Sequence, residues 1–150
     1  MARLLLALFL ASGCYHGPYR GILGGGIDTI AIPFVGNQTA EYAAADSLIQ
    51  ATVVAFREDG QLRLADEGGA DAILLLDILS VDDRIHWDRL LGQYQFSMVV
   101  SVEIKSFEGA VLLRQYESVG RGTYEADDER DKAIGKAARM VAADIVGRAQ

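Results

Sequence analysis

The residue types in this chain that could catalyse a reaction or bind a metal gather in one polar stretch, residues 80–92. Ser80, His86 and Asp88 are the residue types of a hydrolase triad, but the G-x-S-x-G turn that presents such a serine occurs nowhere in the chain. Asp82 and Asp83 add carboxylates beside His86, yet the H-x-x-x-H and C-x-x-C spacings of metal sites are absent from the sequence. Two histidines in the whole chain leave little material for proton transfer. The sequence therefore favours a protein that is not an enzyme and that needs no metal or cofactor.

Trp87 lies in the same polar stretch, between Arg84 and Arg89. A lone tryptophan at the tip of a polar hairpin either folds back onto its own sheet or is held out for a partner, and the sequence leaves both interpretations open. The flanking guanidinium groups can pair with phosphate or carboxylate. Arg84, Trp87 and Arg89 are therefore the candidate residues for contact with a partner molecule.

Cys14, the single cysteine, follows a short apolar segment at the amino terminus. Arg3 supplies a positive start, residues 4–10 (LLLALFL) are all apolar, and small residues precede the cysteine, which is the pattern of a secretion signal. The apolar run is far shorter than the roughly 20 residues that a membrane-spanning helix needs. Residues 11–14 (ASGC) resemble the bacterial lipobox. This resemblance implies cleavage before Cys14 and acylation of its thiol and of the new amino terminus.

The lipobox resemblance divides the chain into three segments. Residues 1–13 are expected to be a lipoprotein signal peptide, residues 14–26 a lipidated, glycine-rich and flexible leader, and residues 27–150 a single folded domain. Tyr15, not Asp, follows the cysteine. By resemblance to the sorting rule of enteric bacteria, this implies a lipid-anchored protein on the periplasmic side of the outer membrane. Several acyl chains hold a protein stably, because each buried methylene contributes about 0.8 kcal/mol.

Length and composition agree with one domain. The chain has 150 residues, of which 51% are hydrophobic, and a formal net charge of -7. A chain of this size buries roughly 68–70% of the surface that it exposes when unfolded, so one core can support it without disulfides. The acidic balance argues against binding DNA or RNA through many phosphate contacts.

Hydrophobic periodicity predicts seven elements in the order β-α-β-β-β-β-α. The expected strands are residues 27–35, 61–64, 72–81, 94–105 and 111–118, and the expected helices are residues 41–58 and 127–148. Thr39 is the expected N-cap of the first helix, and Pro33 places the first strand near a sheet edge or strand end. Residues 82–92 are expected to form a polar loop.

The strand at 94–105 has the clearest alternation in the chain. Its even-numbered residues are apolar, and the polar residues Gln95, Ser97, Ser101, Glu103 and Lys105 share the other face. Two helices with apolar stripes need a sheet face to cover, so we expect both on the apolar face of a mainly antiparallel sheet. The polar face is then left for water or a partner.

With this order of elements, the chain resembles the LptE family of lipopolysaccharide-assembly lipoproteins. The resemblance rests on Cys14-Tyr15-His16, Ile30-Ala31-Ile32-Pro33-Phe34 with Asn37 and Thr39, Phe56-Arg57-Glu58-Asp59-Gly60, Ala70-Asp71-Ala72-Ile73-Leu74, the strand at 94–104, and Ala143-Asp144-Ile145-Val146. It implies an α+β fold in which two helices pack on one face of a mainly antiparallel four-stranded sheet. Residues 61–64 would then be a very short strand.

The same resemblance implies a function. Members of this family plug the outer-membrane barrel protein LptD and help it assemble, and some bind lipopolysaccharide through basic residues. The expected partners are therefore an LptD-like barrel, lipopolysaccharide, and the inner leaflet of the outer membrane through the lipid anchor. Arg84, Trp87 and Arg89 are the contact candidates, and the polar sheet face would dock in the barrel lumen. The alternative is a periplasmic adaptor lipoprotein resembling the curli-secretion or peptidoglycan-synthase-activator proteins.

Overall fold

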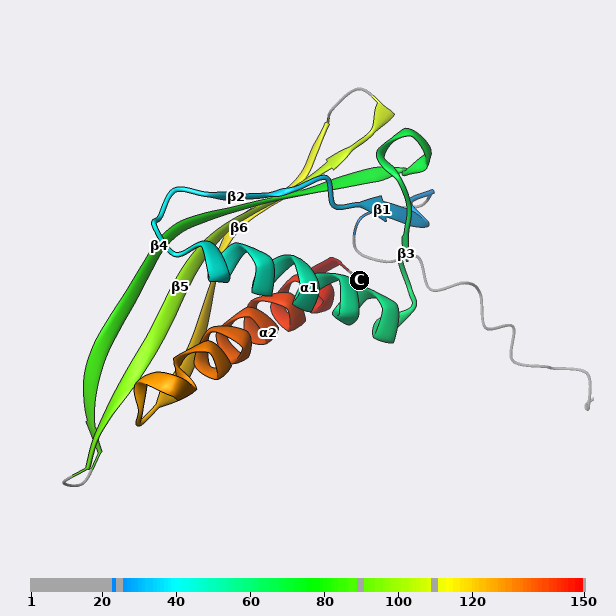
Figure 1. Ribbon diagram of the computed structural model, residues 1–150. Coiled ribbons are helices and arrows are strands. Elements are labelled where there is room, and N and C mark those ends of the chain that lie inside the picture. Colours follow the sequence, from blue (N-terminus) through cyan, green and yellow to red (C-terminus); the bar gives the residue numbers. More distant parts are fainter. Residues whose placement is uncertain (1–22, 24–25, 89–90, 109–110, 150) are drawn as a thin grey trace, which may run out of the picture.

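Two helices lie on the concave face of a curved sheet (Figure 1). The computed structural model describes residues 23, 26–88, 91–108 and 111–149. The strands are β1 (Thr29–Ala31), β2 (Val35–Asn37), β3 (Arg63–Leu64), β4 (Ala72–Asp88), β5 (Leu91–Ser106) and β6 (Leu112–Tyr124). The α-helices are α1 (Tyr42–Asp59) and α2 (Arg130–Ala149), and two short 3-10 turns are Glu67–Gly69 and Asp127–Glu129.

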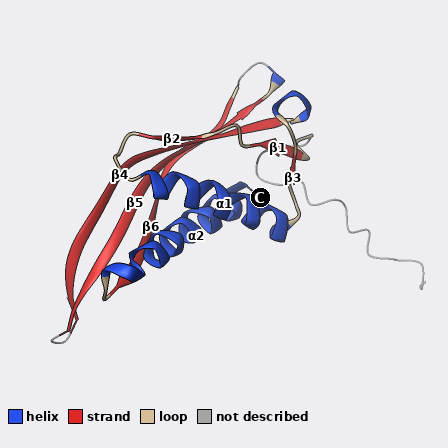
Figure 2. Ribbon diagram, in the orientation of Figure 1, coloured by secondary structure: helices blue, strands red, loops and turns tan. Residues whose placement is uncertain are grey.

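The sheet is mixed and has six strands, in the order β3-β1-β4-β5-β6 with β2 also paired to β4. β4, β5 and β6 are antiparallel neighbours, whereas β1 and β2 both run parallel to β4, and β3 runs parallel to β1. The α+β class and the placement of both helices on one face are confirmed (Figure 2). The expectation of a four-stranded, mainly antiparallel sheet is wrong in its number of strands and in its parallel part.

The single strand expected at residues 27–35 is in fact two strands, β1 and β2. Pro33 lies between them, and it has no N–H to donate to a ladder. The chain therefore leaves the sheet after Ala31, which opposes Ile73, and returns at Val35, which opposes Leu76. This break adds one strand to the expected number.

The polar loop expected at residues 82–92 is also wrong, because β4 continues to Asp88 and β5 begins at Leu91. The two strands stay in register along this stretch, from Asp82 opposite Ser97 to Asp88 opposite Leu91. Backbone pairing extends beyond the part of the sheet that the helices cover. There the apolar alternation is lost, and the sequence looks like a loop.

A β-bulge in β4 changes which residues face the helices. Ile78 opposes Val100 and Ser80 opposes Val99, so the residue between them is an extra one on the β4 side. Before the bulge the even-numbered residues of β4 are buried under the helices. After it the odd-numbered residues share the face of the buried Phe96, and Asp83 is the one directly opposite that ring.

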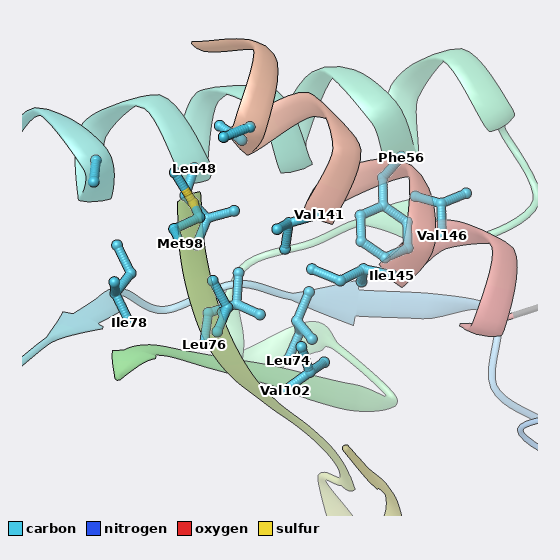
Figure 3. Packing of buried hydrophobic residues seen from close by; sticks show 14 of the residues in the cluster. Leu48, Phe56, Leu74, Leu76, Ile78, Met98, Val102, Val141, Ile145 and Val146 are labelled. Carbon is cyan, nitrogen blue, oxygen red and sulfur yellow. The ribbon is translucent and has the colours of Figure 1, made fainter. Parts of the chain in front are cut away.

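The core fills the space between the sheet and the two helices. Phe56 of α1 lies beside Ile145 and Val146 of α2 (Figure 3). Leu74 of β4 and Val102 of β5 lie below them, on the sheet (Figure 3). Fully burying side chains of this size contributes roughly 1.5–3 kcal/mol each before entropy is counted.

Both predicted helices are confirmed, but α1 begins differently from the expectation. Its N-cap residue is Glu41, and no side chain caps it. Thr39, the expected N-cap, instead accepts a hydrogen bond from the Glu41 N–H at its hydroxyl, at 3.2 Å. At the other end Gly60 adopts a left-handed conformation, with φ at 71°, and its N–H donates to the Phe56 carbonyl.

α2 lies very close to β6 because two glycines of the strand face the helix. A Cβ placed on Gly120 would come within 2.1 Å of the Ala137 carbonyl oxygen. A Cβ on Gly122 would come equally close, 2.1 Å, to the carbonyl oxygen of Ala133. The close approach of helix and strand therefore requires glycine at both positions.

The amino-terminal segments expected from the sequence lie mostly outside the described residues. The signal peptide at 1–13 and Cys14 are among the residues not described, so the segment boundaries stay predictions. Leu23, within the expected leader, is buried and belongs to the core cluster. No helix of the described chain is long and apolar enough to cross a membrane.

Candidate interaction site

The β4–β5 hairpin extends past the rest of the sheet. β6 ends at Tyr124, which pairs with Tyr94 of β5, so residues 86–88 and 91–93 form a two-stranded ribbon. The ribbon projects at the lower left of Figure 1, beyond the first turn of α2. A two-stranded hairpin is marginally stable by itself in water. This hairpin therefore depends on a well-anchored base or on a partner that covers it.

A network of charged and aromatic groups anchors that base. The Asp83 carboxylate accepts hydrogen bonds from Arg130 Nε at 3.0 Å and Nη2 at 2.7 Å, and from the Tyr124 hydroxyl at 3.0 Å. Nη2 of Arg130 also lies 2.7 Å from Glu41 Oε2. Arg130 is the first residue of α2, so this network joins β4, β6, α1 and α2.

The electrostatics of the network favour the charged guanidinium and the neutral phenol. The hydrogen bonds from the guanidinium to Asp83 raise the pKa of Arg130 above its ordinary value, and those to Glu41 add to this effect. Desolvation raises the pKa of Tyr124, and its hydrogen bond to Asp83 raises it further. The Arg130 guanidinium also lies 5.4 Å from the centroid of the Phe96 ring. Arg130 therefore stays charged and Tyr124 stays neutral at neutral pH.

Next to this network, the apolar face of the sheet continues without a helix above it. Ile85 and Tyr94 oppose each other in the hairpin, on the face that carries Phe96 further along β5. Their exposed fractions are 54% and 40%. The Tyr94 ring stacks on Tyr124 with the ring centroids 5.2 Å apart. Ile85 and Tyr94 form the surface that we call the hairpin patch.

Of the three candidate residues, Arg84 and Trp87 lie on β4 in this hairpin, and only the side chain of Arg84 is described. Arg84 is 81% exposed, and its guanidinium forms an ion pair with Asp82, so part of its charge is already neutralised. Trp87 opposes Gly92 at backbone level, and its side chain is outside the described part of the structure. Arg89 is not among the described residues.

Sequence reasoning missed the hairpin patch and the Asp83–Arg130 contact. Tyr94 was expected on the buried face, and it is on that face, but no helix reaches it. Asp83 follows Val81 by two residues, and in a strand this spacing places both side chains on the same face. This spacing is the signal that could have placed Asp83 on the face of the helices. That signal becomes readable only once the bulge at residue 79 is known.

The polar face predicted for β5 is confirmed as the face turned away from the helices. Its neighbours on the same strand, Met98, Val100 and Val102, are fully buried on the other side. Several polar groups on the open face bond to each other: Lys105 Nζ lies 2.6 Å from Glu103 Oε2, and Gln115 Nε2 donates to Glu103 Oε1 at 3.1 Å. On this face, the Glu103 carboxylate therefore already has Lys105 and Gln115 as partners.

The described residues include few side chains that are arranged as a metal site or a catalytic site would require. Among them, no group of three His, Cys, Asp or Glu side chains comes together as metal ligands would. Asp82 and Asp83 already have Arg84 and Arg130 as partners. A cavity of about 390 Å³ lies between α1 and α2, and its lining includes Ala51, Ala55 and Ala142.

A family model described as LptE, lipopolysaccharide-assembly, matches residues 27–149. This chain belongs to that family. The match covers nearly all of the described domain, from before β1 to the last residue of α2. The resemblance recognised in the sequence is thereby confirmed, and lipopolysaccharide assembly is the activity that the family description states.

Solved structures share the fold at low sequence identity. Protein XCC0632 from Xanthomonas campestris has a TM-score of 0.63 and 12% identity, covering 81% of this chain and 82% of that one. PelC from Paraburkholderia phytofirmans, solved as a dodecamer, has a TM-score of 0.53 and 13% identity, covering 82% and 90%. Lipoprotein GNA1162 from Neisseria meningitidis has a TM-score of 0.52 and 9% identity, covering 79% and 95%. Among curated proteins, none matches this chain.

Proposed function

We propose that this chain is an outer-membrane lipoprotein, acylated on Cys14 after removal of residues 1–13, that plugs and helps assemble an LptD-type barrel for lipopolysaccharide transport. The family match over residues 27–149 carries this proposal. The protein acts by binding and positioning and catalyses no reaction. Its lipid anchor keeps it on the periplasmic side of the membrane, where the barrel's inner mouth is accessible.

We propose that the hairpin patch is the surface that contacts the barrel. Ile85 and Tyr94 continue the apolar face of the sheet beyond α2, and covering them would remove apolar area from water. Trp87 and Arg89 follow Ile85 in the sequence, and an amphipathic ring and a guanidinium suit an interface. The Asp83–Arg130 network holds the base of the hairpin rigid, so little conformational entropy is lost on binding.

The polar sheet face has a second role in this proposal. A plug must present polar groups to a water-filled lumen, and Ser97, Ser101 and Glu103 lie on the face turned away from the helices. Arg84 is the described candidate for a lipopolysaccharide phosphate. Because Asp82 already pairs with it, we expect Arg84→Ala to weaken lipopolysaccharide binding less than loss of an unpaired arginine would.

Co-purification tests the barrel partnership. Tagged full-length chain, recovered from gently solubilised outer membranes, should bring a large barrel protein with it. Ile85→Asp should reduce the recovered barrel, because a carboxylate in a desolvated apolar contact is costly. Val54→Asp is the matched control, since Val54 on α1 is similarly exposed, at 49%, and lies away from the hairpin. Recovery of no barrel with the wild-type chain would overturn the proposal.

Depletion of the protein separates this function from the adaptor alternative. Loss of lipopolysaccharide from the cell surface supports the assembly function. A defect in wall synthesis or in surface fibres, with normal surface lipopolysaccharide, supports the adaptor alternative.

A further inference from the structure

The end of the molecule opposite the long hairpin carries a second exposed apolar cluster. The flanks of the β5–β6 connection bear Phe107, Val111 and Leu112, which are 46%, 59% and 49% exposed. Ten large hydrophobic side chains are exposed in the described part of the chain, and three of them fall within residues 107–112. We call Phe107, Val111 and Leu112 the apolar tip. The tip and the long hairpin lie at opposite ends of β5, which has 16 residues and is roughly 50 Å long.

Hydrogen bonds place the apolar tip beside the start of β1. The Phe107 N–H donates to the Asp71 carbonyl oxygen at 2.8 Å. The Asp71 carboxylate in turn accepts the N–H groups of Asp28 at 3.0 Å and Thr29 at 2.9 Å, and the Thr29 hydroxyl at 2.7 Å. The chain therefore enters the folded domain next to the tip, at the end far from the hairpin (Figure 1).

The length of chain before the domain limits how far this end can lie from an anchor on Cys14. Leu23 is buried in the core cluster, so the chain runs nine residue steps from Cys14 to a fixed point of the domain. At about 3.3–3.6 Å per residue, a fully extended chain of that length spans roughly 30 Å. An acyl anchor on Cys14 therefore keeps the end with the tip near the bilayer, whereas the hairpin lies further away along β5.

We infer that the apolar tip is a membrane-contact element, in which Phe107, Val111 and Leu112 enter the interfacial region of the leaflet that holds the acyl chains. This inference rests on the acylation of Cys14 in the proposed function. The tether keeps the tip at high effective concentration beside the bilayer. The tip can therefore stay bound to the bilayer even if its three side chains would bind membranes too weakly without the tether. Burial of the three side chains fixes one end of the domain at the leaflet and leaves the long hairpin to meet the barrel.

Spin labelling of the full acylated chain tests this inference. The chain has one cysteine, and acylation blocks its thiol, so Val111→Cys offers a single labelling site. Val119→Cys is the matched control: Val119 is 39% exposed and lies on β6 roughly 25 Å further along the chain. Each labelled protein is measured free in detergent and in vesicles of phosphatidylethanolamine and phosphatidylglycerol, with oxygen and an aqueous nickel complex as relaxation agents. Leu112→Cys replaces Val111→Cys if the latter does not fold.

We expect the label at residue 111 to lose accessibility to nickel and to gain accessibility to oxygen in vesicles, while the label at residue 119 stays accessible to nickel. Equal nickel accessibility at both positions in vesicles would overturn the inference. Protection of residue 111 only when the barrel is added would also overturn it, in favour of a protein contact. The intact mass reports the anchor separately: an unacylated chain refutes the anchor of the proposed function as well, whereas an acylated chain with an aqueous label refutes the membrane contact alone.

Discussion

Asp83 joins four elements of the fold through one carboxylate. It binds Tyr124 directly and Arg130 through two hydrogen bonds, and Arg130 reaches Glu41 on the other helix. In the sequence, Asp83 looks like one of several acidic residues in a solvated loop. Its role depends on the β-bulge at residue 79, which turns it toward the helices. The groups that contact the Asp83 carboxylate are therefore determined by strand register, and the adjacent residues in the sequence do not predict them.

Replacing Asp83 should destabilise the domain. Asp83→Asn removes the charge that pairs with Arg130, and both side chains are about two-thirds buried, with 31% and 30% exposed. We expect a loss of about 1.5–3 kcal/mol in the free energy of unfolding, the usual size for hydrogen bonds to charged groups. The urea midpoint measures it. Lys132→Ala is the control: its ammonium is 3.8 Å from Glu129 and its side chain is 80% exposed, so stability should hardly change.

Asp71 should make part of the stability depend on pH. The Thr29 hydroxyl, and then the backbone N–H groups of Asp28 and Thr29, hold the pKa of this carboxyl below its ordinary value. A carboxyl with a lowered folded-state pKa stabilises the fold at pH values above about 4, and this contribution is lost as the pH falls through the folded-state pKa. Urea midpoints of the wild type and Asp71→Asn should therefore differ at neutral pH and converge in acid. A difference that stays constant down to about pH 2 would contradict this role.

At the level of elements, the contact of α2 with β6 depends on two glycines of the strand, which have no Cβ. Gly120 and Gly122 leave room for the carbonyls of Ala137 and Ala133, so the helix lies directly against the strand. The helix presents small residues at the same place, with Ala133 and Ala137 both fully buried. This contact fixes the direction of α2 across the sheet, and with it the position of Arg130 at the base of the hairpin.

An added methyl group at the strand should separate the two elements. Gly120→Ala places a Cβ 2.1 Å from a backbone oxygen, which the helix must move to accommodate. We expect a loss of about 1–3 kcal/mol, measured by chemical unfolding. Gly147→Ala on α2 is the matched control, because nothing lies within 4 Å of its Cβ position. It should raise stability by up to about 1 kcal/mol through helix propensity, and an equal loss at both sites would contradict the packing argument.

Hydrophobic periodicity predicted those helices and strands that have one face on the core and the other in water. Both helices and the strand at 94–105 have one face on the core and one in water, so their hydrophobic pattern is regular. The hairpin beyond Asp83 has no such contrast, and the parallel pairing of β1 and β2 with β4 depends on contacts far away in the sequence. Arg84 and Trp87, the candidates chosen from the sequence, lie on β4 in the hairpin, and their contact with a partner stays a prediction. The sequence did not predict the exposure of Ile85, which depends on where β6 ends and α2 begins.

At the level of the whole molecule, two apolar surfaces lie at the two ends of β5. The apolar tip lies beside the point where the chain enters the domain, and the hairpin patch lies at the far end. Between them, the open sheet face carries the polar groups of Ser97, Ser101 and Glu103. A protein tethered by its amino terminus and docked by its opposite end would use both surfaces, and each can be tested without the other.

The barrel contact of the long hairpin can be tested most directly by photo-crosslinking in living cells. A benzophenone amino acid replaces Ile85 in the hairpin patch and, as a control, Tyr42, which is 80% exposed at the start of α1. Mass spectrometry then identifies the products. The proposed function predicts an adduct between the probe at residue 85 and a large outer-membrane barrel, and none from residue 42. Absence of a barrel adduct at residue 85, in cells where the chain is folded and acylated, would contradict it.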